Sequence, residues 1–484
     1  MGNFFAPPAF KPEMSGPKAD AHYKKMRLQV FIGAFIGYAA FYIVRKNFSM
    51  AIPYLEDFGI AKGDLGLVLG MNAVAYAFSK FFMGSVSDRS DARKFLPLGL
   101  LLASLAMAFM VVPITGLDLI NHPERKSLAI VLMGVLNFLV GWFNGMGWPP
   151  CGRVMTHWFS QNERGTWMSI WNCAHNVGGG LVGPMATYGA TWFGFMLYGS
   201  NEKLYFLAGT YIFPAATAIL IAIIAYCLLR DTPQSCGLSS IEKWRNDYPE
   251  NYSAESEEVL PVKDIFFKYV FSNKLLWFIA ISNAFIYMVR YGCLDWAPTM
   301  LNDKHVDLTE AGWAYFAYEY AAIPGTIICG IISDKVFHGK RSMPTIIFMV
   351  LVALFICLYW YAFNMEVPNV KLIVACMIGI GFFIYGPVML IGVQALDLAP
   401  KNAAGTAAGF TGFFGYFFGT AILANYVVGL VAEKVSWDAT FILLLLACAL
   451  SIVFMLLTVK KNNTEDTVKK SDTEETVKKI DKKD

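Results

Sequence analysis

Residues 42–48 read YIVRKNF, and they lie within an apolar run that extends from about residue 28 to residue 53. A run of this length can cross a bilayer as a helix, which needs about 20 residues. It places Arg45 near the middle of the membrane, where a charged side chain costs about 2.5–3.5 kcal/mol on insertion scales. A helix that carries this charge needs a partner side chain, a water-filled cavity or an anionic ligand.

The composition of the chain is that of a membrane protein. Of its 484 residues, 56% are hydrophobic and 15% are charged, whereas soluble globular proteins carry about 25% charged residues. The 39 basic and 36 acidic residues nearly balance, and no basic stripe with interleaved aromatic side chains occurs, so nucleic acid is not expected as a partner. The nine cysteines show no CxxC spacing, which argues against a zinc site or a disulfide framework.

Twelve apolar runs are long enough to cross the bilayer as helices. Their approximate limits are residues 28–53, 64–86, 95–115, 128–150, 165–193, 203–229, 275–300, 309–333, 342–363, 369–396, 403–432 and 436–460. The sequence therefore predicts an all-α membrane protein with twelve transmembrane helices in two six-helix bundles.

Polar stretches divide these runs into two sets of six. We predict a cytoplasmic N-terminal segment (1–27), a six-helix bundle (28–230), a cytoplasmic linker (231–274), a second six-helix bundle (275–460) and a charged cytoplasmic tail (461–484). Lys and Arg concentrate in the connections on the side of both termini. Such an excess marks the cytoplasmic side of a membrane protein.

The two sets of runs repeat each other in sequence. Tyr42 and Arg45 recur as Tyr287 and Arg290, with a shift of 245 positions. Shifts of 238 to 246 relate further pairs, which are Pro53 and Pro298, Gly84 and Gly330, Asp88 and Asp334, Gly141 and Gly379, and Gly165 and Gly405. Two parallel repeats around an axis along the membrane normal describe a major-facilitator-type transporter, with its binding site near the midplane between the halves.

The pseudo-twofold axis predicts that Arg45 and Arg290 face each other across a central cavity. Two guanidiniums alone repel, but together they suit a doubly charged anion, because each can bond two phosphate oxygens. The alternative is that each arginine pairs with a carboxylate in its own half, for which Asp295 and Glu319 are candidates. We expect these two acids to form salt bridges that change between inward- and outward-open states, with fixed structural pairing as the alternative.

Three further charged positions are assigned to gating. Lys46 follows Arg45 and points about 100° away from it on a helix, so it is expected to contact a neighbouring helix or acid. Asp88 and Arg89 end the second predicted helix, where acid and base can bridge helix ends and hold one conformation closed.

Other polar side chains in the runs are candidate ligands. His175 is the only one of six histidines deep in an apolar run, and its imidazole can share a proton with a phosphate or bond a neighbouring helix. Asn172 lies on the same helix face. Lys80 can lead anions into the cavity or extend to the membrane interface. Six tyrosines are candidates for the cavity wall, with ordinary packing as the alternative for each: Tyr38, Tyr42, Tyr76, Tyr287, Tyr385 and Tyr416.

The sequence contains no Walker motif, nucleophile elbow or HExxH. Neither an enzyme nor ATP-driven transport is therefore expected, and no cofactor is predicted.

The sequence resembles the organophosphate:phosphate antiporter family of the major facilitator superfamily. RKNF at 45–48, NCAHN at 172–176 and RYG at 290–292 carry this likeness, which runs from about residue 22 to 460. Closer similarity to family members that carry glycerol 3-phosphate is found in four segments: GMGWPPCGR at 145–153, DTPQSCG at 231–237, YEYAAIPG at 318–325 and AGTAAGFTG at 404–412.

The resemblance implies rocker-switch exchange of external glycerol 3-phosphate for internal inorganic phosphate across a bacterial inner membrane. It implies that Arg45 and Arg290 bind the phosphate, assisted by His175 and Lys80, and that phosphate mimics such as fosfomycin enter by the same route. The expected protein is a multi-pass monomer with cytoplasmic termini, whose partners are the two solutes and the lipid bilayer. The alternatives are a hexose-phosphate:phosphate antiporter and a transporter-like sugar-phosphate sensor.

Overall fold

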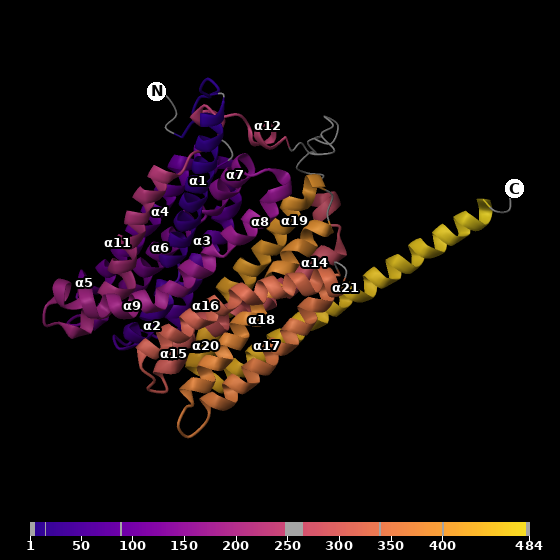
Figure 1. Cartoon of the computed structure of the whole chain (residues 1–484). Coiled ribbons are helices and arrows are strands. Elements are labelled where there is room, and N and C mark those ends of the chain that lie inside the picture. Colours follow the sequence, from indigo (N-terminus) through magenta and orange to yellow (C-terminus); the bar gives the residue numbers. More distant parts are fainter. Residues whose placement is uncertain are drawn as a thin grey trace.

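The computed structural model describes residues 5–14, 16–87, 90–246, 265–337, 340–398 and 401–480. The regular secondary structure of these ranges is helical throughout. Figure 1 shows two bundles side by side, the first coloured indigo to magenta and the second pink to yellow. The predicted all-α fold with two bundles is confirmed.

The described part of the first bundle contains eleven α-helical segments. They are α1 (Pro17–Ile43), α2 (Asn47–Glu56), α3 (Lys62–Ser87), α4 (Ala92–Ala108), α5 (Val112–Thr115), α6 (Lys126–Asn144), α7 (Trp148–Trp158), α8 (Gln161–Asn172), α9 (Ala174–Tyr198), α10 (Tyr205–Leu207) and α11 (Phe213–Leu228). The linker contains the short helix α12 (Ile241–Arg245).

The second bundle has the same general order of long helices. Its segments are α14 (Lys274–Asp295), α15 (Ala297–Asn302), α16 (Leu308–Ile331), α17 (Ser342–Phe363), α18 (Val370–Asp397), α19 (Lys401–Phe413), α20 (Val428–Lys434) and α21 (Trp437–Ile480). A π-helical segment, η9 (Phe414–Val427), joins α19 to α20.

Nine helical stretches of the described residues are long and apolar enough to cross a membrane. They are Ala19–Glu56, Ala92–Thr115, Pro123–Trp158, Glu202–Leu228, Lys274–Asp295, Ser342–Phe363, Val370–Ala395, Thr406–Lys434 and Trp437–Val459. The other three predicted runs are occupied by α3, α9 and α16, which are 26, 25 and 24 residues long. At 1.5 Å per residue, each of these exceeds the roughly 30 Å hydrocarbon core, so they too can span the bilayer.

The first apolar run is not one continuous helix, and the expectation of regular helix through Arg45 is wrong. Helix α1 ends at Ile43 and α2 begins at Asn47, and the backbone N–H of Arg45 donates to the Tyr42 carbonyl at 3.3 Å. The Ser49 hydroxyl donates to the Lys46 carbonyl at 2.6 Å, which satisfies one backbone group freed by the break. Such breaks are tolerated at membrane depth where protein covers the backbone.

A helix break also occurs in the second half, although not at the equivalent position. Helix α14 ends at Asp295 and α15 begins at Ala297, with Pro298 in its first turn. Proline is favoured there because its missing N–H has no partner at a helix start. This break lies at Trp296, six residues after Arg290, whereas Arg45 lies within the break of the first half.

The two ends of the molecule differ, and Figure 1 places the N-terminus and α12 together at one of them. There, Tyr23 of α1 stacks on Trp244 of α12 with ring centroids 4.3 Å apart. We call this end the terminal face. The opposite end, which carries connections 57–61 and 303–307, is called the loop face.

The bundles are packed tightly against each other near the loop face. A Cβ atom on Gly183 of α9 would lie 2.3 Å from the Gly312 carbonyl oxygen of α16, and one on Gly66 of α3 would lie 2.4 Å from the Asn425 carbonyl oxygen. Helix α2 also contacts α15 across the same boundary. Only glycine permits backbones to approach this closely, so these positions hold the loop face closed.

Two polar side chains of the predicted membrane runs are accessible in the half of the molecule nearer the terminal face. Helix α8 packs on α1, α7 and α9 of its own bundle. Asn172 at its end and Lys80 of α3 are both exposed, although each lies in a predicted membrane run. A solute that approaches from the terminal face would therefore meet these two side chains first.

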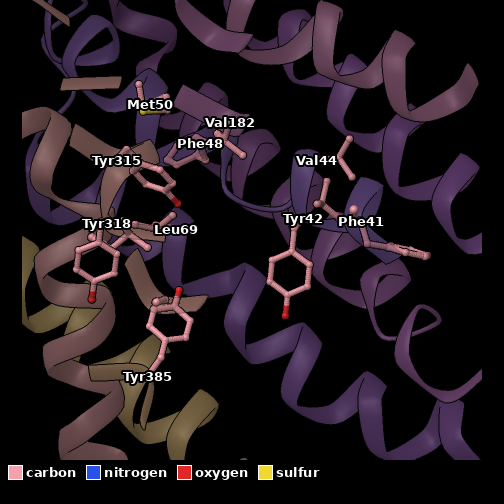
Figure 2. Close-up of a cluster of buried hydrophobic side chains, with 14 of the residues drawn as sticks. Phe41, Tyr42, Val44, Phe48, Met50, Leu69, Val182, Tyr315, Tyr318 and Tyr385 are labelled. Atoms are coloured by element: carbon pink, nitrogen blue, oxygen red, sulfur yellow. The ribbon is translucent and has the colours of Figure 1, made fainter. Parts of the chain in front are cut away.

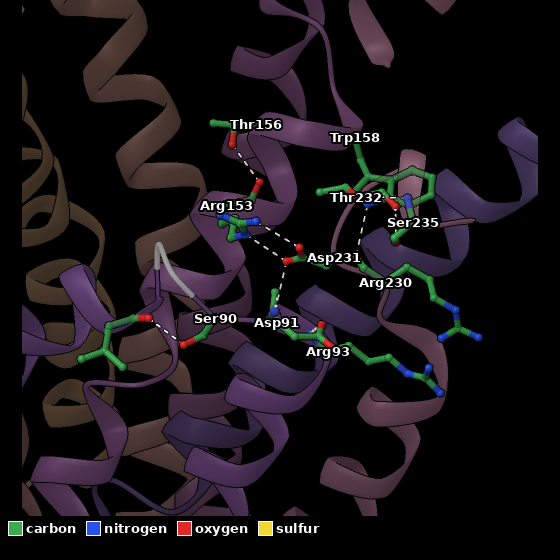
Figure 3. Close-up of polar contacts among 12 residues, drawn as sticks. Ser90, Asp91, Arg93, Arg153, Thr156, Trp158, Arg230, Asp231, Thr232 and Ser235 are labelled. Atoms are coloured by element: carbon green, nitrogen blue, oxygen red, sulfur yellow. Dashed lines mark hydrogen bonds and ion pairs between the residues drawn. The ribbon is translucent and has the colours of Figure 1, made fainter. Parts of the chain in front are cut away.

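A polar network ties the first bundle to the linker at the terminal face (Figure 3). Asp231 accepts hydrogen bonds from Arg153 Nε at 2.9 Å and Nη2 at 3.0 Å, and from the backbone N–H of Ala92 at 3.1 Å. Its carboxylate therefore lies at the N-terminus of α4, where negative charge is stabilised. The predicted gating residues Asp88 and Arg89 lie outside the described residues.

Candidate binding site between the two bundles

Arg45 lies in the break between α1 and α2 and is only 4% exposed. Its guanidinium carbon lies 3.7 Å from the ring centroid of Tyr76 and 5.2 Å from that of Tyr416. Its Nη1 donates to the Tyr42 hydroxyl at 3.4 Å, and its Nε has no hydrogen-bond partner among the described residues. The neighbours of this buried cation are therefore tyrosine rings.

Arg290 of α14 has the same kind of surroundings, and it too is 4% exposed. Its guanidinium carbon lies 4.0 Å from the ring centroid of Tyr385, 4.7 Å from Tyr291 and 5.7 Å from Tyr287. Its Nε likewise has no hydrogen-bond partner among the described residues.

Within the described part of the chain, no carboxylate forms an ion pair with either arginine. A cation–π contact contributes about 0.5–2 kcal/mol. The desolvation penalty of a buried ion is several kcal/mol. The tyrosines reduce that penalty without removing the charge, so the pair of guanidiniums is suited to an anion that enters between them.

Seven side chains, the two arginines among them, form a closed ring of contacts. In order, the separations are Arg45–Tyr42 5.3 Å, Tyr42–His175 5.5 Å, His175–Tyr385 5.9 Å, Tyr385–Arg290 4.0 Å, Arg290–Tyr287 5.7 Å, Tyr287–Tyr416 5.0 Å and Tyr416–Arg45 5.2 Å, between ring centroids or guanidinium carbons. Three members come from the first half and four from the second. The ring therefore crosses the boundary between the halves twice.

His175 near the start of α9 closes one side of the ring and is partly exposed. Its Nδ1 is hydrogen-bonded to the backbone carbonyl of Asn172. With a proton on Nδ1, a neutral imidazole keeps Nε2 as an acceptor. Asn172 thus orients the histidine through its backbone, while its own side chain is exposed.

Four predicted ligands lie outside the ring of contacts: Tyr76 and Asn172, which are described above, and Tyr38 and Lys80. Tyr38 stacks on Trp171 with centroids 4.6 Å apart and meets Tyr42 edge-on at 5.5 Å, so it supports the ring from behind. Lys80 is exposed, and its Nζ lies 5.7 Å from the Trp148 ring centroid. This position is on the solvent-accessible side of the site.

Figure 2 shows the surroundings of the ring. Tyr42 lies on the side of the first bundle, and Tyr315, Tyr318 and Tyr385 lie on the side of the second. The Tyr318 hydroxyl donates to the backbone carbonyl of Arg290 at 3.0 Å. This bond fixes the backbone that carries the second arginine.

Two acids from the second half make polar contacts with the first half. Asp295 accepts a hydrogen bond from Lys46 Nζ at 2.7 Å, and both side chains are buried. Glu319 accepts hydrogen bonds from Asn176 Nδ2 at 3.0 Å and from the Tyr385 hydroxyl at 2.5 Å.

Lys46 thus contacts a neighbouring acid, in agreement with the sequence-based expectation. The expected salt bridge of Glu319 is not present in this conformation: among the described residues its carboxylate is hydrogen-bonded, and it interacts with Arg290 only at longer range. The reason is that α9 packs directly against α16 and brings the Asn176 amide to the carboxylate.

Sequence reasoning missed two residues near the site. Tyr291 follows Arg290, and its ring centroid lies 3.8 Å from Lys46 Nζ. Asn176 follows His175 and bonds Glu319. The repeat contained a signal for Tyr291, because the shift of 245 positions equates it with Lys46.

Comparisons with known proteins agree with this architecture. The profile of the Major Facilitator Superfamily matches residues 34–424. The chain is 49% identical to the glycerol-3-phosphate transporter of Bacillus subtilis (strain 168), covering 95% of this chain and 98% of that protein. It is 48% identical to the glycerol-3-phosphate transporter of Haemophilus influenzae, covering 90% and 92%.

More distant matches include a probable hexose phosphate transport protein of Chlamydia pneumoniae, which is 36% identical over 96% of this chain and 97% of that protein. Among solved structures, a bacterial homologue of the human lysosomal transporter Spinster superposes with a TM-score of 0.68 at 15% identity, covering 92% of this chain and 99% of that one. At that identity the likeness concerns the fold alone.

Proposed function

The chain belongs to the major facilitator superfamily, and from this premise we propose that it is a secondary active antiporter that imports glycerol 3-phosphate in exchange for inorganic phosphate. In this proposal it works as a monomer in a bacterial inner membrane, with the terminal face in the cytoplasm. The excess of Lys and Arg in the connections on that face supports the orientation.

The observation that carries the proposal is that Arg45 and Arg290 both belong to the closed ring of seven side chains. Each guanidinium is buried among rings, and its charge is not matched by a carboxylate of the described chain. A phosphate offers oxygens to both guanidinium forks at once. His175, another of the seven side chains, supplies a further polar group. The aromatic faces of the tyrosines suit the small organic part of a phosphate ester.

The same geometry supports exchange rather than one-way flux. Closing the bundles around an unoccupied site would bring two uncompensated cations together in a medium of low dielectric constant. An anion between Arg45 and Arg290 removes this penalty, so the halves close only when loaded. Contacts across the boundary, such as Lys46–Asp295, then break and re-form as the halves rock around the site.

The test is counterflow in proteoliposomes that contain the purified protein and internal phosphate. We expect uptake of labelled glycerol 3-phosphate that requires internal phosphate and falls at least about tenfold in Arg45→Ala and Arg290→Ala, since each substitution removes charge-assisted hydrogen bonds. Arg125→Gln, which changes an exposed arginine on the loop face, is the matched control. Uptake that ignores internal phosphate, or that survives loss of Arg45, would contradict the proposal.

The same vesicles separate the alternatives. Stronger competition by glucose 6-phosphate than by glycerol 3-phosphate would assign the protein to hexose-phosphate exchange. Saturable binding of either ester without flux would indicate a sensor.

A further inference from the structure

Tyr291 and Lys46 are equivalent positions in the two halves, and they contact each other. Each directly follows the arginine of its half, and a shift of 245 positions relates them. The Lys46 ammonium lies 3.8 Å from the centroid of the Tyr291 ring. The internal repeat is therefore chemically asymmetric here, with a cation in one half and a π face in the other.

The Tyr291 ring contacts two cations at once. Its ring centroid also lies 4.7 Å from the guanidinium carbon of Arg290, and the side chain is 1% exposed. Lys46 in turn lies 2.7 Å from an oxygen of Asp295, one helical turn beyond Tyr291 on the same face of α14. The ammonium is thus held by a carboxylate and a ring that belong to one helix.

We propose that Tyr291 is a positioning residue that links the arginine pair to the Lys46–Asp295 ion pair. This inference rests on the proposed function. The ring holds the ammonium against Asp295 and keeps it apart from the two guanidiniums, so Lys46 does not act as a third ligand of the anion. A shift of Arg290 toward a bound phosphate draws the adjacent Tyr291 away from Lys46. The Lys46 ammonium then keeps its contact with Asp295 but loses its contact with the Tyr291 ring.

The ring, rather than the hydroxyl, makes the contacts that this role needs. The hydroxyl of Tyr291 is buried and has no hydrogen-bond partner among the described residues. Tyr291→Phe keeps the π face and removes only the hydroxyl. Tyr291→Leu keeps an apolar side chain and removes the π face, and Tyr291→Met is a second ring-free variant in case the leucine variant does not fold.

The first experiment needs no substrate. Thermal unfolding of the detergent-solubilised protein is measured for Lys46→Met, Tyr291→Leu and the double variant, and again with Tyr291→Phe in place of Tyr291→Leu. We expect Lys46 to interact with residue 291 when that residue is Tyr or Phe, but not when it is Leu. Lys46→Met and Tyr291→Leu should therefore be coupled by about 2- to 30-fold in the unfolding equilibrium, which is the range of a cation–π contact. Lys46→Met and Tyr291→Phe should be nearly additive, because phenylalanine keeps the π face. Additive effects of Lys46→Met and Tyr291→Leu would overturn the proposal.

The second experiment measures phosphate–phosphate exchange in proteoliposomes. We expect Tyr291→Leu to lower the maximal rate by about 2- to 30-fold with a smaller change in the apparent affinity for phosphate, and Tyr291→Phe to restore most of the rate. A phenylalanine variant as slow as the leucine variant would assign the role to the hydroxyl and overturn the proposal. So would a loss confined to affinity, which would make the ring part of the cavity wall.

The two experiments separate the proposal from the function on which it rests. If the unaltered protein exchanges no phosphate, the proposed function fails while the unfolding measurements still report the contact. If exchange is present and the coupling is absent, only the role of Tyr291 fails.

Discussion

Lys62 forms a 3.0 Å ion pair with Asp303 across the boundary between the two bundles on the loop face. Lys62 also lies 3.0 Å from Glu56 of its own half, and Trp437 Nε1 donates to Asp303 at 2.8 Å. The Lys62–Asp303 pair therefore closes the loop face, and it must break when that face opens.

Lys62→Met is expected to shift the protein toward a conformation with an open loop face. Both partners are partly exposed, with 19% and 29% of their side chains accessible, so the shift should be only about two- to fivefold, in line with at most about 1 kcal/mol for such pairs. The measurement is the labelling rate of Thr187→Cys by an impermeant maleimide. Thr187 lies on α9 one turn after Gly183, beside Gly312 of the other half. The background carries Cys227→Ser and Cys357→Ser, which remove the two exposed cysteines of the described chain. Glu56→Gln, which removes a pair within one half, should leave the rate nearly unchanged.

Gly183→Ala is expected to prevent closure of the loop face. The added methyl group would lie 2.3 Å from the Gly312 carbonyl oxygen, a separation that requires the backbones to move apart. Exchange should fall by about 5- to 150-fold, because one such steric conflict in a packed interior costs about 1–3 kcal/mol. Gly134→Ala is the control, since nothing lies within 4 Å of its Cβ position. Equal exchange by the two variants would show that α9 and α16 need not approach this closely.

The buried pair Lys46–Asp295 should show strong coupling in stability measurements. Removal of one partner leaves a buried charge alone and costs about 3–5 kcal/mol, whereas removal of both is far less costly. We therefore expect Lys46→Met and Asp295→Leu each to lower the unfolding temperature more than the double variant does. Additive losses would mean that the two groups do not depend on each other.

Asp231→Asn should destabilise the terminal face. The Asp231 carboxylate is 2% exposed and accepts two hydrogen bonds from Arg153. The loss of its charge should cost about 3–5 kcal/mol, as for other broken buried pairs. Glu13→Gln removes the exposed pair with Lys243 and should cost less than about 1 kcal/mol. Thermal unfolding in detergent compares the two directly.

The sequence was sufficient to predict the arginine pair, because a shift of 245 positions relates Arg45 to Arg290 and the two runs are long enough to span a bilayer. The residue type also identified Tyr42, Tyr287 and Tyr385 as candidates for the wall of the site. The sequence did not reveal which rings contact which cation, since those contacts depend on how helices from different halves approach each other.

Two local features could not be predicted from the sequence, and each for a specific physical reason. The break at residues 44–46 is hidden because apolar residues continue on both sides of it, so the run reads as one helix. The hydrogen-bonded state of Glu319 depends on Asn176, which approaches only because glycines allow α9 and α16 to pack closely. Neither the packing distance nor the choice of partner is encoded in a local pattern.

The distribution of rings around the two cations also bears on biosynthesis. The ring nearest to Arg45 is that of Tyr76 in the first half, and the ring nearest to Arg290 is that of Tyr385 in the second. The nearest ring to each arginine thus comes from its own half, so this contact can form before the other half is available.

Lys46 and Asp295 differ in this respect, because each finds its counter-charge only in the opposite half. A first half synthesised alone would insert with its arginine beside a tyrosine ring and its lysine unpaired. Association of the halves would then supply the missing carboxylate. Two separately expressed halves should therefore recognise each other in the membrane in part through this buried pair of opposite charges.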